Sequence, residues 1–264
     1  MLPCHIYMVY PDPQPPAITS PAEALTTGQR RLVAVLEVLL CSSLPTQIVI
    51  GQLLAAAGVS PRTDTGELSA PFAFALLLVD SVVLTALMIA LTRAHGESPR
   101  QLWQGPRPIW RELRVGLALV PLVFLMVGLL MNGLMRLFPG LHNVTENPIE
   151  QLAAGGPQQA AMLGFIAVVA GGVREELQRA FILHRFKHYL GGVKLGLIVF
   201  SVMFGVLHFD QGWDVSIAIG LLGLVWGILY IRRGSAMMGM VNHAGFNAAQ
   251  VVQVMIARSL GIPV

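Results

Sequence analysis

Two long segments without a charged residue constrain what this chain can fold into. Residues 115–135 and 151–173 hold 21 and 23 consecutive uncharged positions, and the second includes the apolar run 160–170. A helix needs about 20 predominantly apolar residues to cross a bilayer. Because no water reaches the hydrocarbon core, a spanning segment must satisfy its own backbone hydrogen bonds, as a helix does. We therefore expect an all-α membrane protein.

The composition agrees with a polytopic bundle. Hydrophobic residues make up 55% and charged residues 12% of the 264 positions, whereas soluble domains carry about 25% charged residues. Hydropathy predicts about seven transmembrane helices. Their expected ranges are residues 32–58, 71–91, 115–135, 158–186, 193–208, 215–231 and 235–256. Pro45 lies in the middle of the first range and predicts a kink there.

Basic residues gather in every second connection. They are Arg30 and Arg31; Arg93, Arg100, Arg107, Arg111 and Arg114; Arg185, Lys187 and Lys194; and Arg232 and Arg233. The other connections hold only Arg62 and Arg136 as basic residues, together with several acidic ones. Cytoplasmic loops are enriched in lysine and arginine. We therefore expect a cytoplasmic N-terminus, an outside C-terminus, and an integral protein of the plasma (inner) membrane.

The remaining regions predict little chemistry of their own. Residues 1–29 are rich in proline and lack the apolar stretch of a signal peptide, so we expect a flexible tail before one transmembrane domain, residues 30–264. The connection 93–114 interleaves tryptophans with arginines, which fits either a helix in the headgroup zone or a plain basic loop. Two cysteines, Cys4 and Cys41, offer no disulfide framework. No basic recognition motif indicates a nucleic-acid partner.

Four charges in six positions follow the second uncharged segment: Arg174, Glu175, Glu176 and Arg179. A charge at membrane depth costs roughly 2.5–3.5 kcal/mol on insertion scales. Both glutamates are spaced from Arg179 so that a helix brings carboxylate and guanidinium within reach. Taken alone, such a cluster is usually a solvated helix end. Glu37 and Asp80, in the first two expected spans, are weaker candidates for chemistry.

Two further expected spans carry polar pairs spaced by one helical turn. The fifth ends on Phe204 and His208, so the phenyl ring is expected to pack one turn from the imidazole. The seventh carries His243 and Asn247 in an otherwise uncharged run, with small residues at 244 and 245 that allow close helix approach.

These residue types together suggest hydrolysis of a carbonyl bond. A buried carboxylate near a histidine can take a proton from water. A second histidine and an asparagine amide can donate hydrogen bonds to an oxyanion, and Arg179 can hold one glutamate ionised. No serine, cysteine or threonine shares a comparable constellation, which disfavours a covalent acyl-enzyme.

The three motifs resemble those of the CPBP family of intramembrane endopeptidases, which includes type-two CAAX prenyl proteases and bacteriocin-processing enzymes, also called ABI proteins. The family pattern EExxxR, FxxxH and HxxxN corresponds to Glu175-Glu176 with Arg179, Phe204 with His208, and His243 with Asn247, over about residues 158–257. The arginine spacing departs by one residue. Aligned on Arg179, the two family glutamates fall on Arg174 and Glu175, so Glu175 is glutamate in both alignments.

The resemblance implies a peptidase that acts on a membrane-associated or lipid-modified peptide or protein without a cofactor. It assigns water activation to Glu175, water holding to His208 and oxyanion donors to His243 and Asn247. Glu176, Arg179 and Phe204 are then supporting groups. One alternative is a zinc hydrolase that uses Glu175, His208 and His243, with Glu176 nearby. Another is a non-catalytic membrane scaffold or transporter.

Overall fold

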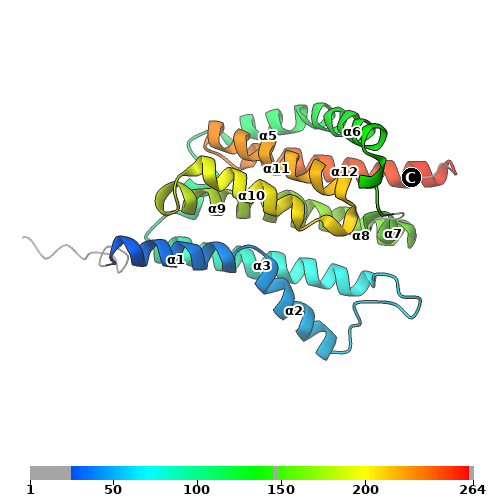
Figure 1. Ribbon diagram of the computed structural model, residues 1–264, viewed down its shortest axis with the longest axis horizontal. Coiled ribbons are helices and arrows are strands. Elements are labelled where there is room, and N and C mark those ends of the chain that lie inside the picture. Colours follow the sequence, from blue (N-terminus) through cyan, green and yellow to red (C-terminus); the bar gives the residue numbers. More distant parts are fainter. Residues whose placement is uncertain (1–24, 145–147, 262–264) are drawn as a thin grey trace, which may run out of the picture.

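The computed structural model describes residues 25–144 and 148–261, and this part of the chain is helical without a β-strand. Figure 1 places α1, α2 and α3 along one side of the bundle, α5 and α6 along the opposite side, and the other long helices between them. The elements are α1 (Thr27–Leu40), α2 (Leu44–Ala56), α3 (Ala70–Ala94), α4 (Pro99–Trp103), α5 (Ile109–Ala118), α6 (Val120–Leu137), η1 (Pro139–Leu141), α7 (Pro148–Ala154), α8 (Pro157–Ile166), η2 (Ala167–Arg174), α9 (Glu175–Tyr189), α10 (Val193–Val206), η3 (Phe209–Gln211), α11 (Trp213–Arg233) and α12 (Met237–Ser259).

The expectation of an all-α membrane bundle is confirmed. Among the described residues, three helical segments are long and apolar enough to cross a membrane, namely Ala70–Ala94, Ile109–Leu137 and Trp213–Arg233. The bent pair α1–α2 makes a fourth if it is counted as one span. The helices that carry the sequence motifs are too polar or too short for the same criterion, and the count of seven stays a prediction. The chain is an integral membrane protein.

A break divides the first expected span. α1 ends at Leu40, α2 begins at Leu44, and the two helices are bent by 43°. Pro45 lies in the first turn of α2, where the absence of its N–H costs nothing. Ser43 has φ of 71°, a left-handed conformation that no other described non-glycine residue adopts. The kink predicted at Pro45 is therefore confirmed, and it begins two residues earlier than the proline.

Two boundaries differ from the sequence expectation. The predicted tail, residues 1–29, lies outside the described residues as far as residue 24, but α1 already includes positions 27–29. The helical segment that contains the third expected span begins at Ile109, because α5 continues directly into α6. The expected range 115–135 lies within this segment, and Glu112, in its added first turns, is paired inside the bundle with Arg233. Its guanidinium makes two contacts of 2.6 Å to the fully buried carboxylate.

Contacts between distant loops show that the helices alternate in direction. At one end, Arg107 donates to the carbonyl oxygen of Arg233 and Arg185 donates to Glu97. These contacts link three of the basic connections. At the other end, the start of α3, α7, α8 and the last turns of α12 share one apolar cluster: Ala73, Leu152, Ala153, Leu163, Val251 and Val254. Which end faces the cytoplasm stays a prediction.

Candidate active site

A continuous helical run from Pro157 to Tyr189 carries the diglutamate, and its middle is a π-helix. The π-helical segment η2 ends at Arg174, so the two glutamates open α9 immediately after it. Such segments occur frequently at functional sites. Gly172 contacts Ala244 so closely that an added Cβ would collide with it. The close helix approach that the small residues 244 and 245 allow is thus present here, between the π-helical segment and α12.

Glu176 is the most buried member of the diglutamate. Its carboxylate accepts a hydrogen bond from Arg179, and its Oε1 lies 3.0 Å from Nδ1 of His243. Arg179 is fully buried, and its guanidinium carbon lies 5.0, 5.1 and 5.5 Å from the ring centroids of Phe200, Phe204 and Trp226. These rings stabilise the buried cation. The structure therefore places Arg179 beside Glu176 despite the shorter spacing.

Glu175 lies on the other side of the same imidazole. Its Oε2 is 3.9 Å from Nε2 of His243, and its Oε1 is 3.9 Å from the guanidinium of Arg174. Its side chain is 13% exposed, whereas that of Glu176 is 1% exposed. His243 therefore lies between the two glutamates, with Nδ1 toward Glu176 and Nε2 toward Glu175.

The ring of Phe204 joins the other motifs. Its centroid lies 5.0 Å from that of His208 and 6.4 Å from that of His243, both in edge-on geometry. The predicted packing of Phe204 against His208 is confirmed. Nδ1 of His208 lies 2.6 Å from the carbonyl oxygen of Phe204. Among the described residues, His208 makes no hydrogen bond or ion pair with Glu175.

Asn247 lies against the π-helical segment. Its amide donates to the carbonyl oxygen of Ala167 over 3.0 Å, and a Cβ at Gly171 would collide with that amide nitrogen. A side-chain amide has two N–H donors, so one remains for another acceptor. The geometry thus brings Asn247 to the helix that carries the diglutamate.

The zinc alternative finds no support in these positions. Among the described residues, no three His, Cys, Asp or Glu side chains form a group that could hold a metal ion. Glu175 and His243 are close, but His208 is turned to its own helix through Nδ1. Whether hydrolysis needs a metal stays untested.

Two charged residues of this region, Asp80 and Arg174, were not predicted to act together. Asp80 is fully buried and accepts hydrogen bonds from Thr46 and Gln47, while Arg174 lies 3.5 Å from it. Arg174 is one of the four clustered charges, but the sequence gives no sign that its partner lies on α3.

Trp226 also joins the site, since its ring stacks on that of His243 with the centroids 3.9 Å apart. Its position in an apolar helix gave no functional signal.

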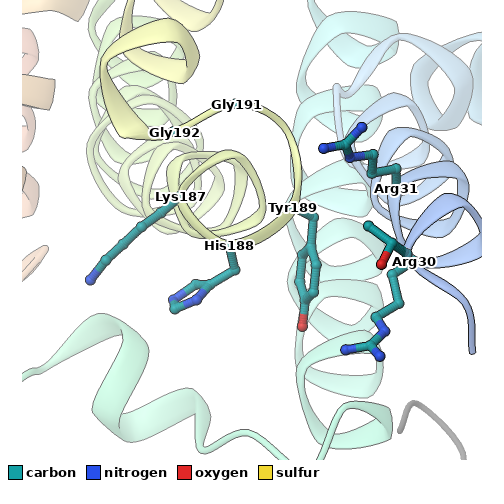
Figure 2. Close-up of a pocket in the computed structure, with 8 residues that line it drawn as sticks. Arg30, Arg31, Lys187, His188, Tyr189, Gly191 and Gly192 are labelled. Carbon is teal, nitrogen blue, oxygen red and sulfur yellow. The ribbon is translucent and has the colours of Figure 1, made fainter. Parts of the chain in front are cut away.

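A separate pocket of about 320 Å³ opens between the start of α1 and the end of α9. Figure 2 shows that Arg30, Arg31 and Lys187 direct their charged groups in different directions around it. None of the predicted site residues lines it. It lies about 20 Å along α9 from Glu175, at a rise of about 1.5 Å per residue, and it is not part of the motif site.

The comparisons with known proteins agree with the motifs. Residues 157–249 match the family model described as type II CAAX prenyl endopeptidase Rce1-like. No curated protein and no solved structure gave a significant match. The matched segment contains the diglutamate, both histidines, Phe204 and Asn247. Over this segment the chain is similar to the type II CAAX prenyl endopeptidases, and it is a membrane peptidase of that general type.

Proposed function

We propose that the protein is an intramembrane endopeptidase in which Glu175 activates water for attack on a peptide bond of a membrane-associated or lipid-modified substrate. The observation that carries this proposal is the position of His243 between two glutamates that have different surroundings. Glu176 is enclosed and paired with Arg179, whereas Glu175 retains exposed surface. The more accessible carboxylate is the one that can meet a water molecule and a substrate.

The contact with Glu176 determines which ring nitrogen of His243 carries the hydrogen. A carboxylate only accepts hydrogen bonds, and that of Glu176 also accepts one from Arg179. Nδ1 of His243 must then carry the hydrogen that is shared with Glu176. In a neutral imidazole this leaves the lone pair on Nε2, on the side that faces Glu175.

The proposed reaction uses this arrangement in three steps. Glu175 takes a proton from water as the water oxygen attacks the carbonyl carbon, with His208 helping to hold the water. Glu175 passes this proton to Nε2 of His243, and the tetrahedral oxyanion accepts hydrogen bonds from the amide of Asn247 and from the new Nε2–H. His243 then gives the proton to the leaving amine, and the C–N bond breaks. No metal takes part.

The test is product mapping with the purified full-length protein in liposomes. The substrates are a prenylated peptide with a C-terminal CAAX sequence and a leader peptide with a double-glycine end. Glu175→Gln should lower kcat on the order of 10²–10⁴-fold, because a general base contributes that much. Glu67→Gln makes the same chemical change at an exposed loop position and should leave kcat unchanged.

Size-exclusion profiles and unfolding temperatures show whether each variant is folded. Normal cleavage by a folded Glu175→Gln variant would reject the glutamate-base mechanism. Failure of the wild-type protein to cleave any member of a wider membrane-peptide library would favour the scaffold or transporter alternative.

A further inference from the structure

Arg174 is a buried cation that lies between Asp80 and Glu175, the proposed base. Its guanidinium donates to Ser43 over 2.8 Å and to Gln178 over 3.0 Å. The same group lies 3.5 Å from Asp80 and 3.9 Å from Glu175. Only 4% of the residue is exposed, so solvent screens these charges weakly.

Residues at the break between α1 and α2 hold Asp80 and Gln178, the neighbours of Arg174. Thr46 and Gln47, in the first turn of α2, donate to the two carboxylate oxygens of Asp80. Gln178 donates to the carbonyl oxygen of Cys41 and to the hydroxyl of Ser43. The left-handed conformation of Ser43 holds that hydroxyl inside the bundle. Strained backbone of this kind persists where surrounding contacts determine it.

Arg174 lies where the π-helical segment meets α9. Arg174 is the last residue of that segment and Glu175 the first of α9. The two side chains therefore leave neighbouring positions of the helix, and Arg174 turns toward α3 while Glu175 reaches His243. The fixed guanidinium attracts Oε1 of Glu175, while Oε2 faces the imidazole of His243.

We propose that Arg174 is a positioning residue, which Asp80 and the α1–α2 break hold in place so that it keeps the carboxylate of Glu175 correctly turned. The N-terminal helices thereby contribute to catalysis without touching substrate. This inference rests on the proposed function of Glu175. It adds a link from α3 to the reacting carboxylate.

The experiment separates positioning from a merely structural role. Asp80→Asn leaves a buried guanidinium without its main partner and should lower the unfolding temperature, whereas the double variant Asp80→Asn/Arg174→Gln removes both charges and should regain stability. A structural role predicts that kcat recovers with stability. Positioning predicts that kcat of the double variant stays low, on the order of 10²-fold below wild type, with KM unchanged.

Single substitutions complete the test. Arg174→Gln should show the same low kcat, and Arg174→Lys should restore part of it because the charge is kept. Arg136→Gln is the matched control at an exposed position and should match wild type. Wild-type kcat in a folded Arg174→Gln variant, or recovery of kcat in the double variant, overturns the inference. Full activity of Glu175→Gln instead rejects the proposed function, and the positioning role with it.

Discussion

The imidazole of His243 is hydrogen-bonded through Nδ1 to Oε1 of Glu176 at 3.0 Å. The ring of Trp226 stacks on the same imidazole, with the two ring centroids 3.9 Å apart and an interplanar angle of 20°. The indole is itself held, because its N–H donates to Asn242 and Asn242 donates to the carbonyl oxygen of Gly116. Groups on three other helices, α5, α9 and α11, therefore fix the plane of this imidazole.

Glu176→Gln should lower kcat less than Glu175→Gln does. A glutamine at 176 can still accept from His243, but it loses the charge that pairs with Arg179. The imidazole is then less firmly oriented, and a misplaced catalytic group costs on the order of 10²-fold. Steady-state kinetics on the cleaved peptide check this order. Equal loss in both variants would show that the two glutamates share one role.

Removal of metal ions should leave cleavage unchanged. His243 uses Nδ1 for Glu176, and the nearby guanidinium groups of Arg174 and Arg179 disfavour a divalent cation. The measurement is kcat/KM after dialysis against EDTA and, separately, 1,10-phenanthroline, followed by addition of Zn²⁺. A loss of activity that Zn²⁺ restores would establish the zinc alternative.

The helices were predictable because hydrophobic segments in a bilayer leave the backbone few options. Pro45 marked the break in the first span, and the one-turn spacing of Phe204 and His208 predicted their contact. The motifs also meet. Phe204 bridges them, since its ring contacts both imidazoles.

The long-range polar contacts could not be read from the sequence. Asp80 and Arg174 are both unusual in apolar surroundings, but nothing in their local patterns pairs them. Glu37 is a similar case, because its position within two turns of Arg31 also allowed a place at the membrane interface. It is instead buried, 2.6 Å from Nε of Arg185 and 2.7 Å from His95. The π-helical segment also lacks a pattern that distinguishes it from an α-helix.

Stability should depend on Glu97 at acidic pH. Burial raises the pKa of this carboxyl, but hydrogen bonds from His184 and Arg185 outweigh it and lower the pKa to about 2, from an ordinary value of 4.5. The unfolded state therefore binds a proton more readily, and this contribution is complete above pH 4.5 and lost as the pH falls toward 2. Unfolding temperatures of wild type and Glu97→Gln in detergent should converge over that range. A constant difference across it would contradict the assignment.

Gly171→Ala should impair catalysis without removing any polar group. A Cβ at Gly171 would collide with the amide nitrogen of Asn247, so the amide must leave the carbonyl oxygen of Ala167 and the proposed oxyanion position. Loss of one oxyanion donor costs about 10²–10³-fold in kcat. Gly128→Ala is the matched control, because an added Cβ there has no heavy atom within 4 Å and alanine favours a helix. It should keep wild-type kcat. Equal kcat in the two folded variants would place Asn247 outside the reaction, whereas a loss confined to Gly171→Ala supports its role as a donor.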